Sequence, residues 1–328
     1  MSQGVPPVQL TKGAATDVPG TTTAALPGRR GFDASRWRNL LIFLGPALVL
    51  IAFFTIYPAI RTIYTSFTTQ VGIGVNPPEQ FVGWQNYQNL WQDFTSGGVI
   101  RTAVINNILW MVIVTPVTVV LGVIFAVLLD RVKYEAVAKA IVFVPMAISA
   151  TAAGVIWKLM YADDPHTGVI NAIWTSLPGA QAISFLGNTS FVNYALMGAQ
   201  VWMGLGFAVV VLSAALKAIP KELTEAAKID GANELDVFWR ITVPLMWPTI
   251  TVIATLTMIG VLKIFDIIYT MTSGGPAGAS EVLATRMYVE AFKNVNPGYG
   301  SAIAVVLLVA VIPIMVINIR RFQTEGQR

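Results

Sequence analysis

Few side chains in this sequence could carry catalytic or metal chemistry. It has no cysteine, so disulfides and thiolate chemistry are excluded, and a single histidine, His166, cannot form a site with several histidines. Asp163 and Asp164 precede His166 and could suggest a metal, but a short polar stretch between apolar runs is more typical of a solvated loop. We therefore expect neither a metal site nor catalytic residues.

A nucleotide-binding motif is also missing. The phosphate-binding loop G-x-x-x-x-G-K-[ST] holds phosphates with backbone N–H groups and a lysine, and no stretch of the sequence matches it. We expect no cofactor in this chain, so energy from ATP would have to enter through another subunit.

Lys263 and Asp266 are unusual charges, because they lie three residues apart in the otherwise uncharged run 249–272. A charge at the centre of a membrane costs about 2.5–3.5 kcal/mol on insertion scales, but this spacing on a helix would let the two charges neutralise each other. We interpret them as a structural or gating ion pair. Direct contact with a substrate is the alternative.

The composition indicates an integral membrane protein. Of 328 residues, 55% are hydrophobic and only 12% charged, whereas soluble domains carry about 25% charged residues. The net charge of +4 and the pI near 9.3 do not indicate a nucleic-acid partner, because the basic residues are scattered among short connectors.

We expect an all-α, polytopic protein with six transmembrane helices, since a spanning helix needs roughly 20 apolar residues. Residues 1–38 are predicted to form a disordered tail, residues 72–98 an ordered loop, and residues 323–328 a C-terminal tail. Apolar runs predict the six spans at residues 39–67, 102–129, 140–161, 191–216, 249–272 and 299–319.

Basic residues predict which connectors face the cytoplasm, because cytoplasmic connectors are enriched in Lys and Arg. The outer loops and their margins hold only Arg101, Lys158, Arg286 and Lys293. The other connectors hold Arg29, Arg30, Arg36, Arg38, Arg131, Lys133, Lys139, Lys217, Lys221, Lys228, Arg240, Arg320 and Arg321. Both termini and the connector 220–248 are therefore expected in the cytoplasm.

The connector from Pro220 to Pro248 is a charged stretch between two apolar runs. Pro220 suits the start of a helix, and Gly231 suits its end, so we expect a helix at residues 221–229. A second short helix at 232–240 should follow before Pro244 breaks the chain. A compact helix–turn–helix at the membrane surface results, and an ordinary interfacial amphipathic loop is the alternative.

The connector also carries a family pattern. Glu225-Ala226-Ala227, Gly231, Ile241 and Pro244 stand at the spacing of the EAA loop, so the chain resembles permease subunits of binding-protein-dependent ABC importers. Val243 departs from the pattern, which usually has leucine there. The resemblance implies that the loop contains a coupling helix that docks into a groove on the ATPase subunit. The implied coupling residues are Glu225, Ala226, Ala227, Lys228, Asp230 and Gly231.

Other stretches resemble the sugar-uptake branch of these permeases, the maltose-permease type, over residues 39–322. The segments Phe143–Ser149 and Leu212–Leu216 are most similar to its α-glucoside permeases. The other matching stretches are Tyr57-Pro58, Phe81-Val82-Gly83, Asn86-Tyr87, Lys263–Asp266, Gly274-Gly275-Pro276 and Tyr299-Gly300.

In the maltose-permease type, two helices form the sugar site, and they correspond here to the fourth and fifth predicted spans. Val261 and Ile264 stand where that type has asparagines, so either this pocket is less polar or other residues orient the sugar. Packing between helices is the alternative for the whole set. The implied substrate-binding residues are Gln200, Met203, Gly204 and Phe207 in the fourth span and Thr257, Val261 and Ile264 in the fifth.

The resemblance implies several partners in a bacterial cytoplasmic membrane. They are a dimer of ATPase subunits, which would bind the ATP and Mg²⁺, a second permease subunit, an extracytoplasmic solute-binding protein, and membrane lipid. The transported sugar would be a disaccharide or α-glucoside such as maltose or trehalose. Two other hypotheses stay open: an ion-gradient-driven secondary transporter, suggested by Lys263 and Asp266, and a non-transporting membrane scaffold.

Overall fold

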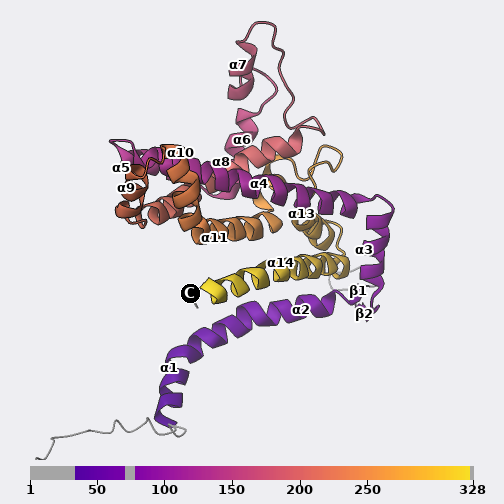
Figure 1. Ribbon diagram of the computed structural model, residues 1–328. Helices are drawn as coiled ribbons and strands as arrows, with labels where there is room; N and C mark the ends of the chain where they lie inside the picture. Colours follow the sequence, from indigo (N-terminus) through magenta and orange to yellow (C-terminus); the bar gives the residue numbers. More distant parts are fainter. Residues whose placement is uncertain (1–33, 71–77, 326–328) are drawn as a thin grey trace, which may run out of the picture. The chain divides into compact units, whose positions relative to one another are not determined.

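The computed structural model describes residues 34–70 and 78–325 (Figure 1). The chain divides into two compact units, Met1–Tyr57 and Pro58–Arg328. The helices are α1 Ala34–Ile51, η1 Ala52–Ile56, α2 Tyr57–Thr65, α3 Gln85–Thr95, α4 Val99–Asp130, α5 Glu135–Phe143, η2 Val144–Ala147, α6 Ala150–Met160, α7 Val169–Thr175, α8 Val192–Lys217, α9 Lys221–Ile229, α10 Glu234–Val237, η3 Phe238–Thr242, α11 Val243–Leu262, α12 Asp266–Met271, α13 Leu283–Tyr288, η4 Val289–Lys293 and α14 Pro297–Glu325.

A polytopic helical membrane protein is confirmed. Among the described residues, five helical segments are long and apolar enough to cross a membrane, and the bent pair α5–η2 and α6 makes six if it is one span. The five segments are Ile42–Thr65, Val99–Asp130, Val192–Lys217, Glu234–Leu262 and Pro297–Ile317. Helix α1 begins at Ala34, inside the predicted tail, whose residues 1–33 lie outside the described residues, as do residues 326–328.

The predicted loop 72–98 contains regular structure where it is described. Strand β1, Thr68–Gln70, pairs antiparallel with β2, Glu79–Phe81, and α3 follows before α4 begins. Asn86 on α3 donates to the carbonyl oxygens of Ser66 and Thr68 at 2.9 Å each, and this ties the helix to β1. The part of the loop at residues 71–77 lies outside the described residues.

The third predicted span, 140–161, is wrong as a single helix. α5 and α6 meet at an angle of 101°. Pro145 lies in the 3₁₀ turn η2, and Ser149 then caps a new helix, its Oγ accepting from the Ala152 N–H at 3.2 Å. A side-chain cap of this kind satisfies one of the free N–H groups of a helix start, so the chain restarts in a new direction.

Pro244 does not break the chain after the connector, contrary to the prediction. The π-helical turn η3 precedes it, in which the Val243 N–H donates to the Phe238 carbonyl oxygen. A proline has no N–H to donate, and its ring clashes with the carbonyl four residues back in a regular α-helix. Because a π turn changes that spacing, the helix continues from Glu234 to Leu262 as one candidate span.

The fifth predicted span, 249–272, is also wrong in its limits. α11 ends at Leu262, and α12 begins only at Asp266. Lys263 is the last cap of α11 and has a non-helical backbone, so Lys263 and Asp266 do not share a helical face. Both are exposed, and no ion pair joins them within the described part of the chain. The expected neutralising pair is absent from this structure.

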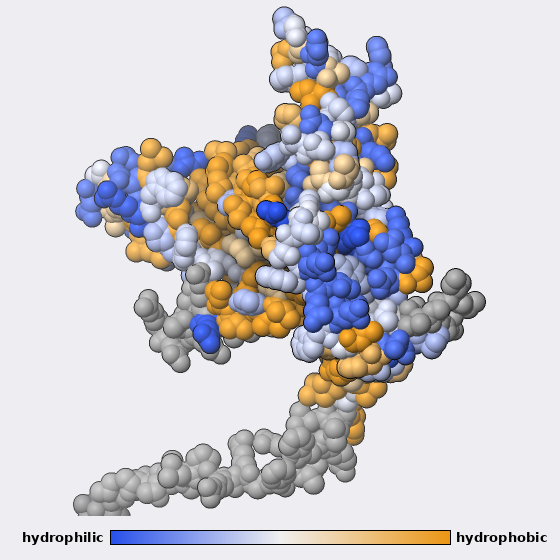
Figure 2. All heavy atoms as spheres, turned by 90° about the vertical axis from the view of Figure 1, so that its right-hand side faces the viewer, coloured by the Kyte–Doolittle hydropathy of each residue, from blue (hydrophilic) through white to orange (hydrophobic). Residues whose placement is uncertain are grey.

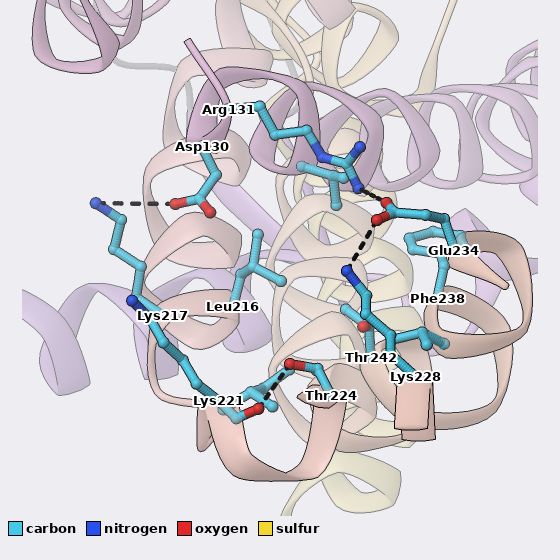
Figure 3. A pocket seen from close by; sticks show the side chains of 13 residues that line it. Asp130, Arg131, Leu216, Lys217, Lys221, Thr224, Lys228, Glu234, Phe238 and Thr242 are labelled. Atoms are coloured by element: carbon cyan, nitrogen blue, oxygen red, sulfur yellow. Dashed lines mark hydrogen bonds and ion pairs between the residues drawn. The ribbon is translucent and has the colours of Figure 1, made fainter. Parts of the chain in front are cut away.

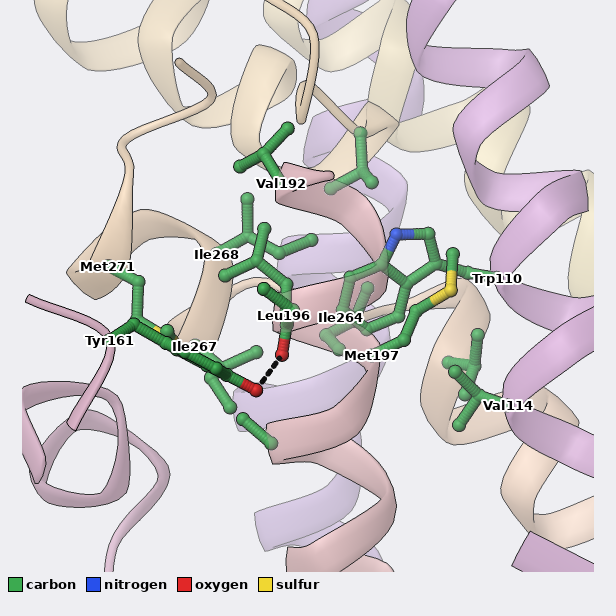
Figure 4. Close-up of a cluster of buried hydrophobic side chains, with 14 residues drawn as sticks. Trp110, Val114, Tyr161, Val192, Leu196, Met197, Ile264, Ile267, Ile268 and Met271 are labelled. Carbon is green, nitrogen blue, oxygen red and sulfur yellow. Dashed lines mark hydrogen bonds between the residues drawn. The ribbon is translucent and has the colours of Figure 1, made fainter. Parts of the chain in front are cut away.

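Helices α4 and α8 lie side by side at the centre of the second unit (Figure 1). Trp110 of α4 packs with Leu196 of α8 and Ile268 of α12 in a buried cluster that Tyr161 closes through a hydrogen bond of 3.1 Å to the Ala195 carbonyl oxygen (Figure 4). This cluster lies near the beginning of α8, away from the connector.

Two neighbouring asparagines on α4 hold the segment between α12 and α13. Asn106 Nδ2 donates to the carbonyl oxygens of Ala279 and Glu281 at 2.8 Å each, and Asn107 Oδ1 accepts from the Leu283 N–H at 2.9 Å. Buried amides that satisfy backbone groups in this way fix an irregular segment against a helix.

Apolar side chains cover much of the outer surface, as the broad hydrophobic area in Figure 2 shows. On α4, for example, Val112 is 64% exposed and Val120 is 54% exposed. Exposed apolar helix faces of this extent suit lipid or a neighbouring subunit.

Candidate functional site

The connector helix α9 spans Lys221–Ile229, as the sequence predicts. Its end is a Schellman motif: the Ala232 N–H donates to the Ala227 carbonyl oxygen at 2.9 Å, and the Gly231 N–H donates to that of Lys228 at 3.1 Å. Gly231 has φ +90°, which a residue without Cβ adopts at little cost. Asn233 then caps α10 by accepting from the Asp236 N–H at 2.9 Å. The turn between the two helices is therefore well defined.

One face of α9 is exposed. It carries Glu222, Glu225, Ala226 and Ile229, which follow a spacing of three and four residues. Ile229 is 87% exposed at the end of the helix. An apolar tip beside small and acidic residues provides a surface that a partner protein could cover.

The opposite side of α9 is attached to the span ends through Glu234. Its carboxylate accepts from Arg131 Nη2 at 2.5 Å and from Lys228 Nζ at 2.9 Å. Arg131 directly follows α4, so one carboxylate joins α4, α9 and α10. Exposed ion pairs of this kind contribute little to folding, but they do connect the elements mechanically.

A second charged group joins the start of α5 to the end of α8. Lys217 at the end of α8 donates to Glu135 at 2.8 Å and lies 3.9 Å from Asp130. Lys139 pairs with Glu135 and also bonds the Ser213 hydroxyl. The ends of α4, α5 and α8 and the connector are thus joined by charged side chains at one end of the second unit.

Between these elements lies an open pocket of about 710 Å³, here called the connector pocket (Figure 3). Its apolar lining includes Val127, Leu216 and Phe238. Its charged lining residues are Asp130, Arg131, Lys217, Lys221, Lys228 and Glu234.

The predicted coupling residues lie together on and after α9. Glu225, Ala226, Asp230 and Gly231 are exposed and Ala227 is half-buried, whereas the Lys228 ammonium faces Glu234. The sequence reasoning missed Arg131 and Glu234 as partners of this helix. Arg131 and Glu234 are far apart in the sequence, so nothing in the sequence alone indicates that they form an ion pair.

The predicted substrate residues are divided by the structure. Ile264 is buried in the same apolar cluster as Trp110 (Figure 4). Val261 is buried in that cluster too, and Met203 packs against it. A Cβ added to Gly204 would lie 3.8 Å from Thr118 Cγ2 of α4, which is an ordinary contact distance, so Gly204 faces α4. In this single chain these four residues pack between helices.

Three predicted substrate residues remain accessible. Gln200 and Thr257 are half-buried, and Phe207 is 37% exposed. Within the described residues, the Gln200 amide makes no hydrogen bond. A polar amide in an apolar helix usually has a partner, so Gln200 is the member of the set most suited to meet a ligand.

A buried carboxyl group lies between α12 and α13, outside the candidate spans. Glu281 is 6% exposed, and burial raises its pKa above the ordinary value. Thr285 Oγ1 donates to Glu281 Oε1 at 3.2 Å, and a Cβ added at Gly274 would collide with the carboxylate. In the described part of the chain, no group of three side chains is suited to hold a metal.

Comparisons with known proteins agree over most of the chain. Residues 90–323 match the family described as binding-protein-dependent transport system inner membrane component. The osmoprotective compounds uptake permease protein GgtC of Synechocystis sp. is 44% identical over 288 residues, which cover 87% of this chain and 99% of that protein. The alpha-glucoside transport system permease protein AglF of Rhizobium meliloti is 38% identical over 313 residues, 92% of this chain and 89% of its own.

A solved structure shares the fold. A chain of a bacterial alginate ABC transporter, in complex with an alginate pentasaccharide-bound periplasmic protein, superposes with a TM-score of 0.74 and 21% identity, covering 87% of this chain and 94% of that chain.

Proposed function

Because the chain belongs to the family of binding-protein-dependent transport system inner membrane components, we propose that it is the permease subunit of an ATP-driven importer of a disaccharide or α-glucoside such as maltose or trehalose. The match over residues 90–323, which includes the connector, carries this proposal. The sugar class rests on similarity to a protein named as an alpha-glucoside permease. The ion-gradient-driven alternative has no support in these similarities, and the pair Lys263–Asp266 that suggested it does not form.

The proposed coupling runs through the connector. The exposed face of α9 docks into a groove on an ATPase subunit, in the cytoplasm as the basic connectors predict. When ATP closes the ATPase dimer, α9 is pulled, and Glu234 transmits the displacement to Arg131 at the end of α4. The rigid helices then move as bodies and switch the cavity between its inward-facing and outward-facing states. Within this chain the task is mechanical, and the partner supplies the hydrolysis.

The sugar path uses the accessible side of α8. Gln200 offers an amide to sugar hydroxyls, Phe207 offers an apolar ring face, and Thr257 offers a hydroxyl from α11. Their partial exposure in the single chain favours a path completed by a second permease subunit. Met203, Gly204, Val261 and Ile264 shape the wall behind them. A solute-binding protein outside delivers the sugar.

Reconstitution tests this proposal. The chain is co-expressed with the ATPase, second permease and solute-binding protein proposed as its partners, and the complex is placed in proteoliposomes. We expect uptake of labelled maltose or trehalose that requires both ATP and the binding protein, and Gln200→Leu should weaken it with the complex still assembled. Uptake by this chain alone, driven by an ion gradient, would refute the proposal.

A further inference from the structure

The connector pocket is lined both by polar side chains of α9 and by apolar side chains from the ends of two candidate spans. Lys221, Thr224 and Lys228 share one side of α9 and line it, while Val127 of α4 and Leu216 of α8 line it from the last turns of two candidate spans (Figure 3). The pocket therefore lies at the level where a membrane-crossing helix passes from the apolar interior into the polar headgroup region.

The pocket is rich in positive charge, and one of its cations has no partner. Arg131 and Lys228 share Glu234, and Lys217 lies against Glu135 and Asp130. Lys221 makes no ion pair within the described part of the chain, although it lines the pocket. Four of the charged lining residues are basic and two are acidic, so an added anion would find an excess of positive charge.

A buried polar group points to a ligand independently of the charges. Thr242 lines the pocket from the π turn η3 and is only 8% exposed. Its hydroxyl makes no hydrogen bond to any described residue, and its side chain lies beside those of Lys228 and Phe238 (Figure 3). The Thr242 hydroxyl is open to the pocket and has no partner there, so an acceptor atom from a ligand would complete its bonding.

We propose that the connector pocket binds the phosphate headgroup of an anionic phospholipid. The phosphate accepts from the Lys221 ammonium and the Thr242 hydroxyl, and the acyl chains follow the apolar residues at the ends of α4 and α8. The ligand would then bridge α9 to two spans beside Glu234. Membrane lipid composition would thereby affect how firmly the connector is attached to the helices that it moves.

Native mass spectrometry of the full chain in detergent, titrated with phosphatidylglycerol or phosphatidylcholine, tests the site without any transport assay. We expect a preference for phosphatidylglycerol that Lys221→Gln weakens about fivefold, the factor expected for one basic residue near a membrane surface. Lys133→Gln is the matched control, because it removes the same charge from an exposed residue close to Arg131 that does not line the pocket.

A second variant and a second ligand complete the test. Thr242→Val keeps the side-chain shape, removes the hydroxyl and should also weaken phosphatidylglycerol binding in a chain that still folds. Wild-type binding by both Lys221→Gln and Thr242→Val, or an equal loss in Lys133→Gln, would overturn the proposal. Inorganic phosphate that binds as tightly as the lipid would overturn the lipid assignment.

Discussion

Arg131, directly after α4, donates a hydrogen bond of 2.5 Å to the carboxylate of Glu234, 103 residues further along the chain. Glu234 also holds Lys228 on the connector helix. The side of α9 opposite to its exposed face is therefore attached to a membrane-spanning helix by a single carboxylate.

Glu234→Gln should separate coupling from folding. The pairs are exposed, so the unfolding temperature should change little, whereas ATP-driven uptake should fall by about 2- to 30-fold, the range seen for substitutions that alter coupling between sites. Asp236→Asn is the matched control, since among the residues that the structure describes the Asp236 carboxylate pairs with Arg240 alone, one turn away. An equal loss of uptake in both variants would contradict the role given to Glu234.

Glu225→Lys should uncouple the proposed importer. Glu225 is exposed on α9, on the face proposed to dock, and a reversed charge at a protein interface costs several kcal/mol, so ATP-driven uptake should fall at least about tenfold. Co-purification of the ATPase subunit measures the loss of docking. Asp163→Lys is the control, because it reverses a charge in the loop after α6, which packs near the beginning of α8. Unchanged uptake by Glu225→Lys would rule out the docking face.

Gly231→Ala should destabilise the end of α9 through the backbone alone. Nothing lies within 4 Å of an added Cβ, but φ is +90°, and a left-handed conformation costs an L-residue roughly 1–2 kcal/mol. Hydrogen exchange at the amides of residues 231 and 232 should be slowest with glycine at position 231, faster in Gly231→Asn and fastest in Gly231→Ala. If alanine protects these amides as well as glycine does, the cap is not what ends the helix.

Glu281 should make stability depend on pH. Burial raises the pKa of its carboxyl group above the ordinary value of 4.5, so the folded chain binds this proton more tightly than the unfolded chain does. Stability from this group is fully present below about pH 4.5 and is lost as pH rises through the folded pKa. Glu281→Gln should therefore raise the unfolding temperature at pH 7 and make no difference in acid.

Glu290→Gln provides the comparison for Glu281. Glu290 is 6% exposed and pairs with Arg286, so its substitution leaves a half-buried guanidinium without a partner and should destabilise the chain. If both Glu281→Gln and Glu290→Gln lower the unfolding temperature at pH 7, Glu281 is stabilised as a carboxylate and the expected pH dependence is wrong.

Periodicity and capping residues predicted much of the fold. The uncharged run 102–129 predicts a helix that corresponds to α4, Val99–Asp130. Pro220 and Gly231 predict the limits of α9 correctly. These elements depend on local properties: apolar length, the missing N–H of proline and the positive φ of glycine.

The breaks in the helices are not predicted by hydropathy, because an apolar run shows how long a buried segment is and not where its helix axis turns. The run 140–157 carries no charge, so hydropathy alone predicts one helix there. Pro145 and the Ser149 cap divide it, and these two residues are the local signal of the break. The spacing of Lys263 and Asp266 predicts a pair within one helix, but both side chains are exposed and stand on either side of the break between α11 and α12. The links of Glu234 to Arg131 depend on tertiary structure and have no local signature.

The proposed docking of α9 on an ATPase subunit can be tested directly, because the sequence contains no cysteine. Ala226→Cys places a unique thiol on the exposed face of α9, and Ser176→Cys places one after α7 as the control. In membranes containing the whole complex, Ala226→Cys should cross-link to the ATPase subunit and should react with impermeant maleimide only from the cytoplasmic side, and Ser176→Cys should do neither. Labelling of Ala226→Cys from the exterior, or no cross-link to a nucleotide-hydrolysing subunit, would show that α9 does not dock on a cytoplasmic ATPase.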